Sequence, residues 1–114
     1  MTQANAPAAG WRRVALFSVL HAVCWTLAFP PFELWFLAFV AVGPLAVAAV
    51  AAARTRTVAV CVFLASMVGW MVLNRWVGSI SGAGLPAIGA YLASCTVLAA
   101  LCIRRIGRSA RFAR

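Results

Sequence analysis

Four long uncharged stretches make up most of this chain, and arginines stand between and around them. The stretches are residues 14–32, 34–53, 57–74 and 76–103. Each has at least 18 residues, about the length of a helix that crosses a hydrocarbon core ~30 Å thick. None alternates polar and apolar residues as the strands of a membrane barrel do. The pattern therefore predicts an all-α membrane protein with four transmembrane helices.

Prolines and glycines refine the limits of these helices. Pro30 and Pro31 end the first helix, because proline lacks an amide hydrogen and restricts the residue before it. Pro44 lies inside the second helix, where membrane helices tolerate a kink. Residues 77–84 are rich in Ser and Gly and predict a flexible loop or a re-entrant turn. The expected helices cover about 14–29, 34–53, 58–73 and 85–103.

The composition agrees with a membrane environment. Hydrophobic residues make up 66% of the 114 residues, more apolar surface than a soluble domain of this length can bury. Small residues four positions apart, Ala65 with Gly69 and Gly89 with Ala93, predict faces where helix backbones approach closely. Thin, alanine-rich helices bury little on their own. We therefore expect self-association, or association with a missing C-terminal half.

The charges predict the orientation of the chain. The net charge is +9, from ten arginines and one glutamate. Four spans place both termini and the 54–57 loop on one side with nine arginines, and leave Glu33 and Arg75 on the other. Arginine-rich ends are typical of the cytoplasmic face. Residues 1–13 are then a disordered cytoplasmic N-terminus and residues 104–114 a basic cytoplasmic tail. Arginines in these positions contact lipid phosphates, so no nucleic-acid partner is expected.

The cysteines and the one histidine lie inside the expected spans. The sequence has no CxxC and no Cys/His pair at metal-binding spacing, so no metal site and no cofactor are expected. His21 could act as a proton relay or ligand contact. A neutral imidazole bonded to a neighbouring helix is favoured, because no acidic residue lies at that depth. The cysteines, interpreted as small buried hydrophobes, are Cys24, Cys61, Cys95 and Cys102.

Aromatic and polar residues gather at the predicted outer ends of the helices. They are candidate contacts for lipid or substrate, although tryptophans also serve as anchors at membrane interfaces. Glu33 would guide a substrate there, or cap a turn or pair with an arginine such as Arg75. The candidates are Glu33, Trp35, Asn74, Arg75 and Trp76.

The segment 26–35, TLAFPPFELW, is the most distinctive part of the sequence. On its own it predicts an interfacial turn between two spans. With the elements that follow, it resembles the apolipoprotein N-acyltransferases over about residues 14–103. No single element is specific, and the resemblance depends on their order. After a short basic loop, these elements are Gly69, residues 74–80, the Gly-Leu-Pro turn at 84–86 and Ala-Tyr-Leu at 90–92.

The resemblance implies that the catalytic residues lie in a different part of the protein from the membrane helices. That family has eight membrane helices and an extracytoplasmic nitrilase-like domain with a Glu base, a Lys and a Cys nucleophile. The Cys takes an acyl chain from a phospholipid and passes it to the N-terminal Cys of a lipoprotein. This chain has no Lys, and its one acid is Glu33. No position inherits a catalytic role, and the chain alone is expected to be inactive.

The same resemblance implies the N-terminal membrane portion of such a protein, either a fragment or a truncated relative. It would be a multi-pass protein of the bacterial inner membrane that contacts phospholipid, and contacts lipoprotein through the missing catalytic domain. The alternative is a small standalone four-helix membrane protein. A holin-like pore-former needs only small apolar helices and a basic tail. A small multidrug transporter is disfavoured, because it needs a carboxylate within the membrane.

Overall fold

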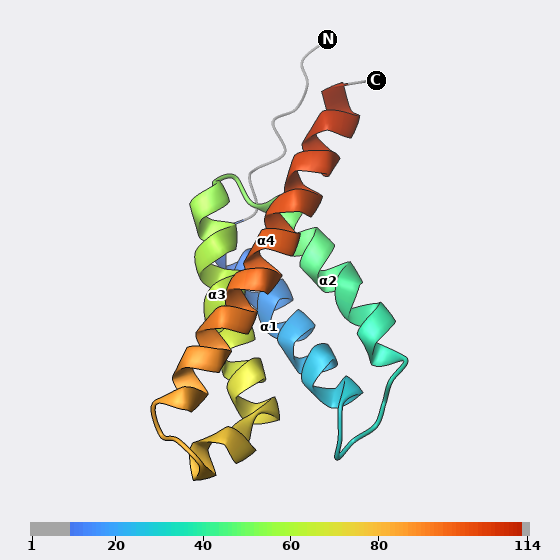
Figure 1. Cartoon of the computed structure of the whole chain (residues 1–114). Coiled ribbons are helices and arrows are strands. Elements are labelled where there is room, and N and C mark those ends of the chain that lie inside the picture. The colour runs from blue at the N-terminus through green and yellow to red at the C-terminus, as the bar shows by residue number, and fades with distance from the viewer. Residues whose placement is uncertain (1–9, 113–114) are drawn as a thin grey trace.

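The computed structural model describes residues 10–112, and over this range the chain is helical without any strand. Its elements run up and down in turn (Figure 1). The start of α1, the end of α4 and the α2–α3 connection lie at one end of the molecule, and the α1–α2 turn and η1 lie at the other. The all-helical prediction is confirmed. The elements are α1 (Trp11–Ala28), α2 (Leu37–Ala51), α3 (Thr55–Leu73), the 3-10 helix η1 (Arg75–Ser79) and α4 (Gly84–Phe112).

Two of the helices are long and apolar enough to cross a membrane. They are α3 over its whole length and α4 over Gly84–Ala110. The helix α2 is equally apolar but has 15 residues. Large apolar side chains point outward on all four helices, as Leu16, Phe39, Val68 and Leu98 do. Apolar exteriors of this kind are typical of helices that face lipid.

Most helix ends lie within three residues of the predicted ones, and α3 begins at Thr55 instead of residue 58. The helix α2 begins at Leu37 instead of residue 34, because the residues after the prolines form turns. The helix α4 continues beyond Ile103 to Phe112. Arginine and alanine favour helix, and the stretch has one unfavourable residue, Gly107, and no proline, so the basic tail is helical as far as the structure describes it. The disorder predicted for the N-terminus lies outside the described residues, except that Trp11–Arg13 form the first turn of α1.

The loop predicted at 77–84 is also more regular than expected. Its first residues belong to η1, and Ile80 and Ser81 both donate backbone hydrogen bonds to the Val77 carbonyl. Ser81 in turn accepts the Gly84 amide through its carbonyl and its side chain, each at 3.1 Å. Local hydrogen bonds of Ser and Gly thus make a defined turn where composition predicted flexibility.

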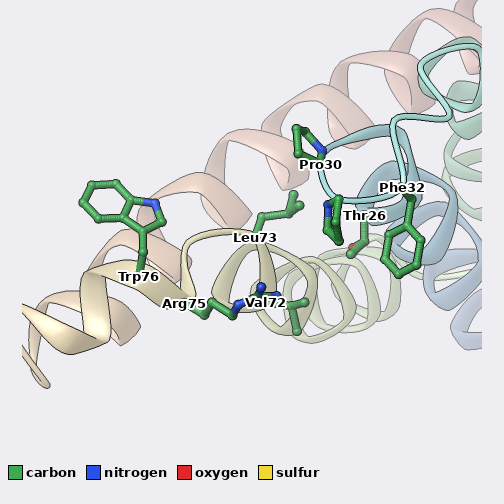
Figure 2. Close-up of a pocket in the computed structure, with 8 residues that line it drawn as sticks. Thr26, Pro30, Phe32, Val72, Leu73, Arg75 and Trp76 are labelled. Carbon is green, nitrogen blue, oxygen red and sulfur yellow. The ribbon is translucent and has the colours of Figure 1, made fainter.

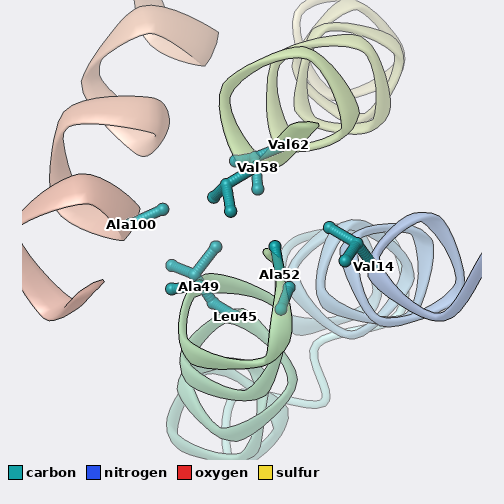
Figure 3. Packing of buried hydrophobic residues seen from close by; sticks show 8 residues of the cluster. Val14, Leu45, Ala49, Ala52, Val58, Val62 and Ala100 are labelled. Atoms are coloured by element: carbon teal, nitrogen blue, oxygen red, sulfur yellow. The ribbon is translucent and has the colours of Figure 1, made fainter. Parts of the chain in front are cut away.

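The core is built mainly from alanine and valine. Side chains from all four helices converge in one cluster (Figure 3). Small side chains allow the helix backbones to approach closely, which is how membrane helices associate without a hydrophobic driving force. The cluster contains Val14, Leu45, Ala48, Ala49, Ala52, Val58, Val62 and Ala100.

Two of the glycines lie at close helix contacts in the faces predicted from the sequence. A Cβ atom added at Gly89 would lie 2.8 Å from Cγ of Met71, so α4 rests directly on α3 there. A Cβ atom at Gly69 would lie 3.1 Å from Oγ1 of Thr26, so α3 rests on α1. Ala93 is fully buried. The small-residue faces predicted around Gly69 and Gly89 are therefore packing faces.

A buried arginine joins α4 to the end of α2. Arg104 is only 3% exposed, and its Nη1 donates to the carbonyls of Ala49 at 2.7 Å and Ala52 at 2.8 Å. Its Nη2 donates to the Ala53 carbonyl at 3.1 Å. The last carbonyls of a helix have no partner within the helix, and a cation also suits the negative end of the helix dipole. Arg104 thus caps α2 from another helix.

Replacing Arg104 should destabilise the fold. In Arg104→Met the terminal carbonyls of α2 lose their buried donors, and we expect the free energy of unfolding to fall by about 2–3 kcal/mol. Thermal unfolding in detergent, followed by circular dichroism, measures the change. Arg13→Met is the control, because Arg13 is exposed. Equal stability of the two variants would contradict the capping role.

Candidate functional site

A cavity opens at the end of the molecule where the α1–α2 turn meets η1. It has a volume of about 170 Å³. The turn supplies one wall, and the end of α3 with the start of η1 supplies the other (Figure 2). The lining residues are Thr26, Pro30, Pro31, Phe32, Val72, Leu73, Arg75 and Trp76.

The prolines shape the first wall. Because Pro30 and Pro31 cannot donate backbone hydrogen bonds, α1 ends and the chain folds back on its own last turn. The amides of Phe32 and Glu33 both donate to the Phe29 carbonyl, at 3.2 and 3.3 Å. Glu33 has a φ of 54°, a left-handed conformation that is uncommon for residues other than glycine. This tight reversal holds Phe32 against the cavity.

Asn74 shapes the second wall. Its side-chain amide donates to the Trp70 carbonyl at 2.9 Å, and its backbone amide donates to the same oxygen at 3.0 Å. Its own carbonyl accepts the Val77 amide at 2.9 Å, which starts η1. Asn74 therefore caps α3 and turns the chain so that Arg75 and Trp76 reach the cavity.

The structure brings together part of the predicted set of contact residues. Arg75 and Trp76 line the cavity, and Asn74 supports them from the cap. Glu33 and Trp35 are exposed and are not part of its lining. The Trp35 ring instead packs on Phe36 and Phe39, with ring centroids 6.5 and 6.4 Å apart.

The lining suits binding more than catalysis. Arg75 is the one cationic side chain in the cavity, and most of the other lining residues are apolar. The Thr26 hydroxyl donates to the Ala22 carbonyl at 2.7 Å. No cysteine or carboxylate lines this cavity. A positive charge at an apolar mouth fits a ligand with an anionic head and a hydrocarbon chain.

An apolar groove continues from this cavity along the helices. It has a volume of about 370 Å³ and lies between α1 and α3. Thr26 and Val72 line both the cavity and the groove, so the two are adjacent. The other lining residues of the groove are Val19, Ala22, Val23, Leu27, Ala65, Val68 and Gly69.

An aromatic cluster between the second half of α1 and the last turn of α3 was not predicted from the sequence. The Trp25 ring lies 5.5 Å from Phe29 and 5.9 Å from Trp70, between ring centroids. His21 stacks beside Trp25 at 6.3 Å. The spacing of His21, Trp25 and Phe29 at four-residue intervals places them on one helix face, and this signal was available in the sequence.

His21 bonds to a neighbouring helix, as the favoured interpretation predicted. Its Nδ1 lies 2.8 Å from the Ala41 carbonyl oxygen of α2. A carbonyl only accepts, so Nδ1 carries the proton. The bond ties α1 to α2. Elsewhere within residues 10–112 no group of three His, Cys, Asp or Glu side chains gathers as metal ligands would.

Comparison with known protein families gave a match that covers most of the chain. Residues 21–113 match the family model described as the apolipoprotein N-acyltransferase N-terminal domain. The match runs from the middle of α1 through α4, and it covers the cavity, the aromatic cluster and the lining of the groove except Val19. No curated protein and no solved structure matched the chain.

The bond between His21 and Ala41 can be tested by substitution. His21→Leu fills the position with an apolar side chain and removes the hydrogen-bond donor. We expect the free energy of unfolding to fall by about 1 kcal/mol. Thermal unfolding in detergent measures it. Val19→Leu on the exposed side of α1 is the control. A His21→Leu protein as stable as its control would show that the bond does not hold α1 to α2.

Proposed function

The chain belongs to the apolipoprotein N-acyltransferase family through that family's N-terminal domain, and we propose that it forms the membrane-embedded part of such a protein. Its place is the bacterial inner membrane, in the pathway that matures lipoproteins. The acyl transfer itself requires a Glu, Lys and Cys set. The 114 residues contain no lysine, so that set must come from outside this sequence.

In this proposal all four helices cross the membrane and both termini are cytoplasmic. The alternating course of the helices supports it, since the start of α1 and the end of α4 lie on the side of the α2–α3 connection (Figure 1). Arginines gather at that end, and the opposite end has Arg75 and Glu33. The 29 residues of α4 extend ~43 Å at 1.5 Å per residue, which exceeds a hydrocarbon core of ~30 Å. The excess would carry its basic end beyond the membrane.

The cavity and groove at the outer end would receive a phospholipid. Arg75 faces the phosphate there, and the groove between α1 and α3 accepts an acyl chain. The observation that carries this role is the shared wall of Thr26 and Val72, which places a cationic cavity beside an apolar groove. A lipid held in this way would present its headgroup to a catalytic domain on the same side. The lipoprotein substrate would reach the catalytic domain on that side as well.

Further helices or a second copy of the chain would cover part of the outer surface. The exposed apolar residues of α2 and α4, such as Phe39 and Ile106, face either lipid or such a partner. Association with the remaining helices of a complete acyltransferase fits the family best. Self-association is the alternative.

Cysteine labelling tests the orientation. In a variant with the four native cysteines replaced by alanine, Ser81→Cys should react with a membrane-impermeant maleimide added to intact cells, because Ser81 lies on the outer turn. Ser109→Cys should react only after the cells are opened. Labelling of Ser109→Cys in intact cells would overturn the proposed topology.

Tryptophan substitution tests the role of the outer end. In a complete acyltransferase that carries these residues as its first helices, Trp76→Ala should slow acylation on the order of tenfold, the effect of about 1.4 kcal/mol, while membrane insertion stays normal. Trp11→Ala is a matched control, because Trp11 is 65% exposed and Trp76 62%. If the two variants are equally active, the outer cavity has no part in acyl transfer.

A further inference from the structure

A second polar pocket lies at the opposite, arginine-rich end of the molecule. It has a volume of about 300 Å³, and it forms where α4 passes the start of α3. Arg104 is fixed there by the carbonyls of α2, and Arg108 reaches the Ala53 carbonyl at 3.5 Å. The lining residues are Thr55, Leu101, Arg104, Arg105 and Arg108.

The positive charge of this pocket is not balanced by the protein. Three arginines line it, and Arg54 and Arg56 flank Thr55 in the sequence. The one carboxylate side chain of the sequence is Glu33, in the turn at the other end. Like charges held together in a partly apolar setting repel one another strongly. The pocket therefore favours an anion from outside the chain.

The start of α3 adds to the positive character of the same place. Thr55 is the first residue of α3, and the N-cap residue Arg54 gives this 19-residue helix no side-chain hydrogen bond. The positive end of the helix dipole thus adds to the arginines. In addition, Nε of the buried Arg104 has no hydrogen-bond partner among the described residues. This nitrogen is itself buried, so the arginines that can reach a ligand are the exposed Arg105 and Arg108.

The neighbouring surface indicates what kind of anion it is. Leu101 lines the pocket, and Leu98, one turn closer to the middle of α4, is 63% exposed. Residues three apart share a helix face, so an apolar strip leads from the pocket toward the membrane interior. A free phosphate has no apolar part that could contact such a strip, whereas a lipid acyl chain would lie along it.

We propose that this pocket binds the phosphate headgroup of an anionic phospholipid, with an acyl chain along Leu101 and Leu98. Arginine forks pair with phosphate oxygens in a fixed geometry. Basic pockets between membrane helices bind anionic headgroups on the cytoplasmic side, which this end faces in the orientation proposed above. The bound lipid would neutralise the cluster where α2, α3 and α4 meet.

Native mass spectrometry of the complete chain tests this site. The protein is purified in mild detergent with equal amounts of phosphatidylglycerol and phosphatidylcholine. We expect retention of phosphatidylglycerol, and retention lower on the order of tenfold in Arg105→Gln/Arg108→Gln, because each arginine near the headgroup contributes to attraction. Arg12→Gln/Arg13→Gln is the matched control, since it removes two exposed arginines outside the pocket and should retain the lipid.

Equal retention of both lipids, or equal losses in the two double variants, would overturn the proposal. Displacement of phosphatidylglycerol by inorganic phosphate would overturn the assignment to a lipid. Arg105 and Arg108 are exposed, so the fold should survive; if it does not, Arg105→Gln alone provides the comparison. The assay does not involve the outer cavity or acyl transfer, so its result is independent of the proposed function.

Discussion

The packing of the helices depends on hydrogen-bond donors for the carbonyl groups at the end of α2. In apolar surroundings an unpaired carbonyl is costly, and α2 ends beside other helices instead of in open solvent. Arg104 meets the demand with three hydrogen bonds that reach back 51 to 55 residues along the chain. These bonds fix the level of α4 against α2. The outer end of α4, with η1 before it, is fixed as a consequence.

The interior follows from the same setting. Because lipid is as apolar as the core, large side chains gain little by burial, and close backbone contact becomes the main source of cohesion. Alanine and valine therefore fill the centre, while larger side chains such as Phe39 and Leu98 stay outside. Polar links such as the one from His21 to Ala41 then select among the packings that small residues allow.

Hydropathy, prolines and small-residue spacing were sufficient to predict four helices, the turn at Pro30 and the packing faces at Gly69 and Gly89. The sequence predicts that the basic stretch after Ile103 is a tail outside the helices. The carbonyls that Arg104 bonds at the end of α2 are distant in sequence, and no local pattern reveals them. Arg75 and Trp76 could be chosen as contact residues from their place at a helix end. That they, and not Glu33 or Trp35, would line a cavity depended on the left-handed turn at Glu33 and the cap at Asn74.

The anchoring of α4 has a consequence for how the protein responds to its bilayer. From Gly84 to Arg104 the helix rises ~30 Å, close to the thickness of a hydrocarbon core. A single helix in a thinner or thicker membrane can slide to improve its match. Here sliding would break the bonds of Arg104 to α2, so a mismatch must be relieved by tilt of the whole bundle or by deformation of the lipid. The distance from Gly84 to Arg104 thus sets the membrane thickness that the bundle matches without tilt or deformation of the lipid.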